Sequence, residues 1–210
     1  MELPAAKEER DETGKETPVE MRTMYGAYHE AGHIVIAAVR GLVLRPDGLM
    51  VISNGEGFCV YCTQPDESDA SRESVVVSSF AGYYAAKRFC DEHLCPDFLD
   101  PLPQISDDWK DARKIIDKLS TEHLAGKSLL TVLLGLEKES KHLVDQHWPS
   151  IEALAIALLA KDPEPMRPLK TGQTWSHHTG PVRYMDGEEA VGILAQHGIG
   201  AICEPLGAIC

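Results

Sequence analysis

The residue spacing with the most chemical content is His29-Glu30-Ala31-Gly32-His33, a His-Glu-x-x-His sequence. Side chains four positions apart share one face of a helix, so both imidazoles can approach a single ion. Imidazole nitrogen is a good zinc ligand, and two ligands from one rigid turn lose little entropy on binding. Glu30 is placed to take a proton from a water molecule that the metal activates. The pattern predicts a zinc site with His29 and His33 as ligands and Glu30 as general base.

The alternative is that these three residues occur together by accident on a structural helix. Chance placement in a chain of this composition gives roughly 0.03 such matches, so the pattern alone is only suggestive. Its setting strengthens it, because Tyr25 and Tyr28 precede it and Ile34-Val35-Ile36 follows. A buried helix does not normally carry such polar groups without a partner, since each unsatisfied group costs several kcal/mol. Zinc binding is the favoured interpretation.

Two histidines leave a zinc site in need of a third protein ligand. The metzincin continuation is absent, because Ile36 and Val39 stand where that pattern has Gly and His. On periodicity the best candidate is Asp108, which continues an apolar helical stripe formed by Ala112, Ile115 and Leu119. A free carboxylate on such a face is costly, and a metal ion would explain it. Helix capping or dipole stabilisation, worth about 0.3–1 kcal/mol, explains it equally well.

The neighbouring charged residues on this helix, Asp107, Asp111, Lys114 and Lys118, lie on its other side and are expected to be solvated. Glu137 and Glu139 compete with Asp108 as third ligand. Glu137, however, has the i,i+4 spacing to Lys141 of an ordinary surface pair.

Several segments resemble the C-terminal zinc peptidase domain of the FtsH-type membrane AAA metalloproteases. The segment Tyr28–His33 is similar to the family's zinc motif, and Ser79–Ala86 to its Leu-Ala-Gly-x-x-Ala-Glu helix. Residues 151–161 and Met185–Glu189 are similar to its late Leu/Ala-rich helix and its closing Leu-x-Gly-Glu-Glu segment. The family's third ligand is an Asp in an Asn/Asp-Asp-hydrophobic-Lys-x-Ala setting, which Asp107–Ala112 matches. The resemblance covers about residues 21–195 and implies that Asp108 is the third zinc ligand.

The departures from that family concern its motor and the surroundings of the site. No Gly-x-x-x-x-Gly-Lys-[Ser/Thr] phosphate loop is present, so neither an AAA motor nor ATP binding is expected. Pro103–Ser106 replaces the family's Gly-Ala run before the ligand Asp, and Leu119–Gly126 replaces the Gly-rich stretch that borders the active site in relatives. The family's peptidase domains form six-fold rings, so an oligomer is compatible with the sequence, although no ring interface can be identified.

The elements that must position these residues are mostly helical. Periodicity and capping signals predict helices over residues 21–40, 74–90, 106–119, 127–147, 149–161 and 187–197. Short strands are expected over 42–44, 49–52 and 58–62, with turns at 46–48 and 54–57 and loops over 95–104 and 162–186. The expected fold class is mainly α, a helical zincin-like peptidase domain with a small β-hairpin or sheet. It spans residues 21–198, between a disordered charged tail (1–20) and an irregular tail (199–210).

Composition excludes several classes of protein. The 210 residues are 43% hydrophobic and 25% charged, which is ordinary for a globular domain. A net charge of -13 would be repelled by nucleic acid and by anionic membrane surfaces, so neither partner is expected. No stretch reaches the roughly 18–20 apolar residues of a membrane helix. No export signal is visible, so the six cysteines are interpreted as reduced thiols of a cytoplasmic protein.

Two further constellations are expected to be unremarkable. Cys59 and Cys62 would face opposite sides of a strand, so separate thiols are favoured over a redox pair or a structural metal site. His177 and His178 are expected in a solvated loop, with a contact near the metal as the alternative.

Three functions remain compatible with the sequence. The favoured one is an ATP-independent zinc endopeptidase acting on peptides or unfolded protein, with His29, His33 and Asp108 holding zinc and Glu30 as general base. The alternatives are a zinc-stabilised binding or assembly module without catalytic activity, and a metal-dependent hydrolase of a non-peptide substrate.

Overall fold

The computed structural model of the chain describes residues 9–10, 16–17, 19–62, 68–95, 107–168 and 180–204. The predicted disordered tail over residues 1–20 lies mostly outside these ranges. Within it, the two-residue strands β1 (Glu9–Arg10) and β2 (Glu16–Thr17) pair antiparallel. The predicted irregular tail is described as far as residue 204, and in it Cys203 forms an isolated parallel bridge with Leu44.

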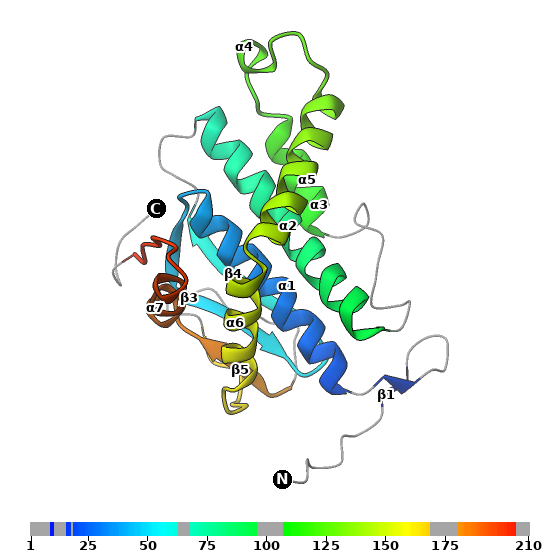
Figure 1. Cartoon of the computed structure of the whole chain (residues 1–210), viewed down its shortest axis with the longest axis vertical. Helices are drawn as coiled ribbons and strands as arrows, with labels where there is room; N and C mark the ends of the chain where they lie inside the picture. The colour runs from blue at the N-terminus through cyan, green and yellow to red at the C-terminus, as the bar shows by residue number, and fades with distance from the viewer. Residues whose placement is uncertain are drawn as a thin grey trace.

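Helices make up most of the described chain, which confirms the prediction of a mainly helical fold (Figure 1). They are α1 (Val19–Val39), α2 (Asp69–His93), α3 (Asp107–Ile116), α4 (Thr121–Leu124), α5 (Leu129–Gln146), α6 (Trp148–Leu159) and α7 (Gly187–Gln196). Helix α2 begins at residue 69 rather than 74, because the Ser68 side chain caps it by accepting a hydrogen bond from the backbone N–H of Ser71. The short helix α4 was not expected.

The sheet has three antiparallel strands in the order β4 (Gly57–Cys62), β3 (Val43–Ile52) and β5 (Val182–Met185). Strand β5 corrects the prediction of a loop over residues 162–186. It is only four residues long, so its sequence carries little signal, and it is defined by pairing with Leu49–Ile52 of β3.

The start of the sheet differs from the expectation in one more respect. Residues 46–48 are not a turn between two strands but lie within the single strand β3, whose register with β4 shifts between Leu44 and Leu49. Such a bulge lets Gly48 reach the junction of β5 and α7, where a Cβ would lie only 2.2 Å from the Met185 carbonyl oxygen. The turn predicted at residues 54–57 is present between β3 and β4, where it occupies residues 53–56.

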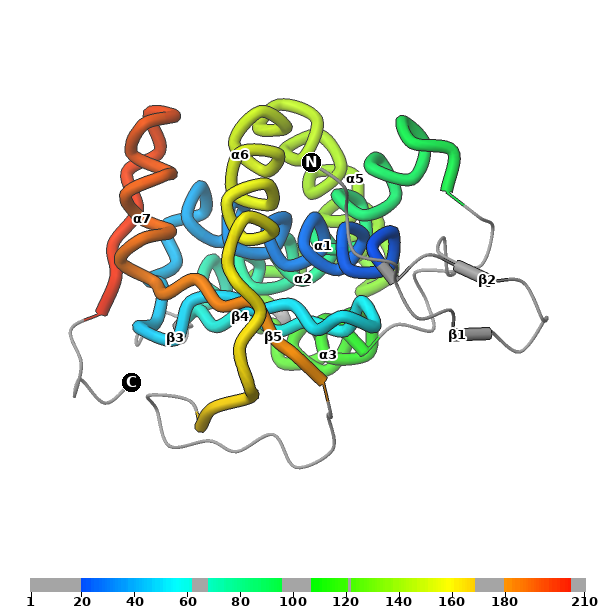
Figure 2. Tube along the Cα trace, turned by 90° about the horizontal axis from the view of Figure 1, so that it is seen from below, coloured from blue at the N-terminus to red at the C-terminus, as the bar shows by residue number. Residues whose placement is uncertain are grey.

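Helix α1 lies at the centre of the fold. Figure 2 shows the sheet along one side of α1 and α6 on the other, with α2 running beside it, and α1 contacts all of these elements. Residues 30–38 are consequently all buried. No helix in the described part of the chain is long and apolar enough to cross a membrane.

The crossing of α1 and α2 depends on a small residue at Gly32. A Cβ there would lie 2.6 Å from the Ala85 Cβ and 2.7 Å from the Ala81 carbonyl oxygen. Both distances are shorter than any ordinary van der Waals contact, so the two helices pack nearly backbone to backbone.

We expect Gly32→Ala to destabilise the protein because it forces α1 and α2 apart. Overpacking of a tight core costs about 1–3 kcal/mol, which should lower the melting temperature measured by circular dichroism by several degrees. Gly135→Ala in α5 is the matched control, because nothing lies within 4 Å of its added Cβ. Helix propensity should make that variant equal to or more stable than the parent. Equal melting temperatures for both variants would contradict the tight crossing.

Candidate metal centre

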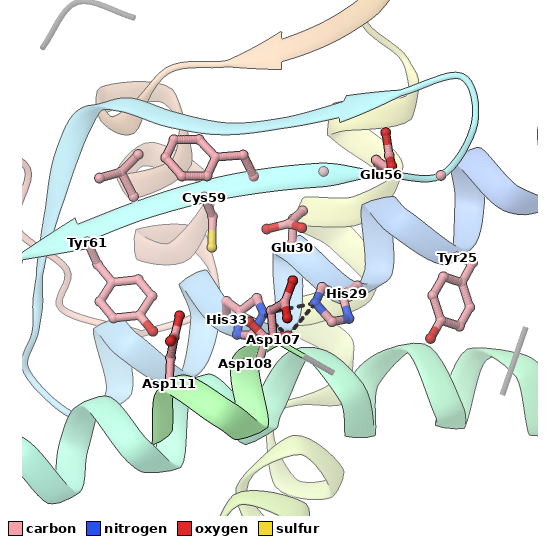
Figure 3. A pocket seen from close by; sticks show the side chains of 14 residues that line it. Tyr25, His29, Glu30, His33, Glu56, Cys59, Tyr61, Asp107, Asp108 and Asp111 are labelled. Atoms are coloured by element: carbon pink, nitrogen blue, oxygen red, sulfur yellow. Dashed lines mark hydrogen bonds and ion pairs between the residues drawn. The ribbon is translucent and has the colours of Figure 1, made fainter. Parts of the chain in front are cut away.

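The His-Glu-x-x-His residues lie on α1 with both imidazoles directed at one point. The Nε2 atoms of His29 and His33 are 3.0 Å apart. Asp108, at the start of α3, places its Oδ2 atom 3.0 Å from His29 Nε2 and 3.5 Å from His33 Nε2. One ligand atom from each of the three residues lies within 4.8 Å of the others, so the group could hold a metal ion (Figure 3).

Helix α2 determines which nitrogen of His33 faces this group. His33 Nδ1 lies 2.7 Å from the carbonyl oxygen of Ser78. A carbonyl only accepts hydrogen bonds, so Nδ1 carries the proton and donates it, and in the neutral ring Nε2 keeps its lone pair for an ion. Metal-binding histidines are usually oriented by an acceptor of this kind. Gly82 also belongs to this contact, because a Cβ there would lie 2.3 Å from His33 Nε2.

His29 is held less closely. Its ring stacks near that of Tyr25, with centroids 6.4 Å apart, and its buried Nδ1 atom has no hydrogen-bond partner among the described residues. A buried, unsatisfied ring nitrogen is unfavourable. A metal ion coordinated at the other nitrogen, Nε2, would leave Nδ1 as the protonated nitrogen of the ring.

The charges of the three residues depend on one another. Burial by itself lowers the pKa of His33, but the carboxylates of Asp108 and Glu30 and the Ser78 carbonyl outweigh it and raise that pKa to about 9. Burial by itself raises the pKa of Asp108, but the two imidazoles outweigh it and hold that pKa well below its usual range. The site therefore stabilises positive charge beside an ionised carboxylate, which is the condition that a metal cation also needs.

Glu30 lies between the three residues and strand β4 and is only 6% exposed. Burial raises its pKa, and the nearby His29 and His33 partly offset that effect. The Cys59 thiol of β4 lies beside the Glu30 carboxyl group and lowers its pKa. Burial and the adjacent Glu30 raise the pKa of the Cys59 thiol well above its usual value, so the thiol stays protonated.

Gly57 leaves the space that the Glu30 side chain occupies. A Cβ at position 57 would lie 2.6 Å from Glu30 Cγ and 2.7 Å from its Oε1 atom. Strand β4 can therefore pass directly over the acid. Any larger residue at position 57 would displace one or the other.

A cleft of about 610 Å³ opens over this group. Strand β4 and the turn before it form one wall, and the first turns of α3 form the other. Cys59 and Tyr61 are two positions apart on β4, so their side chains lie on the same side of the strand, and both point toward the site. Burial raises the pKa of Tyr61, so its phenol is neutral. In the described part of the chain β4 pairs only with β3, which leaves its other edge toward the cleft.

The structure brings the three predicted metal ligands together and places the two alternative third ligands elsewhere. Glu137 accepts a hydrogen bond from the Tyr84 hydroxyl at 2.7 Å, and Glu139 pairs with Arg40 at 2.5 Å, so neither belongs to the group. The Asp108 stripe is present in part, since Ala112 is fully buried and Leu119 is 8% exposed.

Other expectations need correction or stay open. Asp107 and Asp111 are solvated, as expected, but they also line the cleft. Cys59, expected to be an unremarkable thiol, contacts Glu30, and only its position opposite the site in the folded sheet reveals this. The side chain of Cys62 and the whole of His177 and His178 lie outside the described residues.

Comparison of the chain with protein-family models found no match, and comparison with curated proteins found no significant similarity.

We expect the purified protein to contain about one divalent metal ion per chain. His33→Ala should lose most of it, because the variant removes the ligand that α2 orients. Elemental analysis of protein purified without added metal is the measurement. Full occupancy in a His29→Ala, His33→Ala double variant would contradict this site.

Asp108→Ala should weaken metal binding far more than Asp107→Ala. Asp108 belongs to the group that could hold a metal ion. Asp107 does not, since its side chain is 92% exposed and pairs with Lys110. The loss in a chelator competition titration should exceed the roughly 10–100-fold cost of removing an outer contact. Asp111→Ala is a second control from the same helix. Equal losses in the three variants would show that Asp108 acts only on the helix terminus.

Proposed function

We propose that the chain is a zinc-dependent peptidase that hydrolyses peptide bonds in unstructured peptides, as its resemblance to the FtsH-type peptidase domain implies. The observation that carries this proposal is the position of Glu30, a buried acid beside the His29, His33 and Asp108 group on the floor of a cleft. A metal site that only stabilised the fold would not need a further carboxylate there, because burying one is costly.

The donor set favours a catalytic zinc ion over a structural one. Structural zinc sites have four protein ligands, whereas catalytic sites have three and leave one position for water or substrate. The group found among the described residues has three members, and it opens onto the cleft. Zinc bound there would supply Lewis acidity, which acidifies a coordinated water molecule and polarises the carbonyl of the substrate.

Glu30 is suited to move the proton in this reaction. Burial raises its pKa toward the range in which a carboxylate both accepts and returns a proton. Gly57 leaves room for the carboxyl group beside the metal-binding group, because a Cβ at that position would lie 2.7 Å from Glu30 Oε1. Glu30 takes a proton from the attacking water and then delivers it to the nitrogen of the departing amine.

The edge of β4 is suited to hold the substrate. An extended peptide can add to a free sheet edge through main-chain hydrogen bonds, which do not depend on its sequence. Residues 57–61 of β4 line the cleft, so a peptide on that edge would pass over the metal-binding group. Because the sequence has no phosphate loop, ATP should not affect the reaction, and folded proteins should not be substrates.

We expect Glu30→Gln to retain the metal and the fold but to lose activity on an unstructured substrate such as casein. The amide keeps the shape of the side chain and removes the proton acceptor, so hydrolysis should fall by at least about 100-fold. Glu188→Gln, on the exposed first turn of α7, is the matched control and should retain activity. Chelation should abolish wild-type activity, and added zinc should restore it.

A zinc-stabilised module without catalytic activity makes the opposite prediction. Zinc-loaded wild type would then cleave no member of a broad peptide library, and Glu30→Gln would behave like the parent in every assay. That result would reject the peptidase proposal and leave the metal-binding group intact.

A further inference from the structure

Carboxyl groups outnumber basic side chains in the lining of the cleft, as far as the structure describes the chain. Of the described residues around it, five are acidic, namely Glu30, Glu56, Asp107, Asp108 and Asp111, and none is Lys or Arg. A dication at the metal-binding group offsets only two of the five carboxylates. The remaining negative charge lies in a concave site, where the surrounding protein concentrates the electrostatic field.

The acidic residues are distributed along the path that a peptide on β4 would follow. Figure 3 shows Glu56 and Asp111 on opposite sides of the metal-binding group, with Asp107 beside Asp108 between them. Glu56 immediately precedes β4, and Asp107 and Asp111 occupy successive turns of α3 on the facing wall. An extended chain over the group would therefore meet a carboxylate on either side of the metal.

The carboxylates of α3 remain accessible to a second cation. Asp107 and Asp111 pair with Lys110 and Lys114 of the same helix, at 2.8 Å and 2.5 Å. The two aspartate side chains are nevertheless 92% and 63% exposed, and neither lysine lines the cleft. Exposed pairs of this kind contribute little and exchange readily with other partners.

From this arrangement we infer that the cleft selects cationic peptide segments, with Lys or Arg on both sides of the bond held over the metal-binding group. The inference rests on the proposed peptidase function and names its substrate class. Glu56, Asp107 and Asp111 are the residues that determine this specificity, and acidic peptides are excluded by repulsion from the same side chains.

Binding experiments test this selectivity without depending on turnover. Three labelled peptides share one central sequence and carry Lys, Gln or Glu flanks, and fluorescence anisotropy measures their affinity for zinc-loaded Glu30→Gln protein. The Lys-flanked peptide should bind at least about tenfold more tightly than the Glu-flanked one at low salt. The difference should shrink as salt shortens the Debye length to about 8 Å at 0.15 M ionic strength.

Charge variants of α3 test whether the cleft itself is responsible. Asp107→Asn and Asp111→Asn should each reduce the preference for the Lys-flanked peptide by about two- to fivefold. Lys114→Gln should increase it, because it removes the competing partner of Asp111. Asp117→Asn, an exposed residue outside the cleft, changes the net charge equally and should have no effect. Equal affinities for the three peptides, or an equal effect of Asp117→Asn, would overturn the inference.

Cleavage of the three peptides by the wild type distinguishes a failure of the charge selectivity from a failure of the peptidase proposal. Cleavage without any preference among the three peptides would overturn the charge selectivity and leave the peptidase proposal standing. Charge-selective binding with no cleavage of any peptide would support the selectivity and reject the peptidase.

Discussion

The close packing of α1 against α2 is the contact on which the site depends. Gly32 brings the two helices together, and the Ser78 carbonyl then lies within 2.7 Å of His33 Nδ1. That hydrogen bond directs the lone pair of Nε2 at His29 and Asp108. A crossing wider by one methyl group would weaken the hydrogen bond and leave the tautomer of His33 unspecified.

The sheet covers the site from the other side of α1, and glycines again allow the close approach. Gly26 and Gly55 bring the turn between β3 and β4 against the helix, because a Cβ on Gly26 would lie 2.2 Å from the Gly55 carbonyl oxygen. Gly57 lets β4 pass over Glu30, and Cys59 then reaches its carboxylate. The side chain of Glu30 therefore packs against backbone and a protonated thiol and is only 6% exposed, which explains why burial dominates its pKa.

The ionisable groups of the cleft form two sets, one at its centre and one around its rim. Locally, His33 and the partly buried Asp108 shift each other's pKa in opposite directions. At the rim, the carboxylates of Asp107 and Asp111 are exposed and, among the described residues, pair only with lysines of the same helix, so they remain accessible to solvent and to charged ligands. The first set includes the group that could hold a metal ion, whereas changes in the second set should cost the fold little.

The sequence by itself determined the mainly helical fold and the pairing of His29 with His33, because one helical turn relates the two residues. The apolar stripe that Asp108 continues left this residue an even choice between metal ligand and helix cap, and the resemblance to the FtsH-type domain implied the ligand. These are local patterns, and they hold wherever the helix is placed. Only the tertiary structure decided that Ser78 orients His33, that Cys59 contacts Glu30, and that the solvated Asp107 and Asp111 border a cleft. Strand β5, which was expected to be a loop, likewise exists only through its pairing with β3. Each of these contacts joins residues far apart in the chain, and their relative position is determined by helix packing and strand register, which no local spacing encodes.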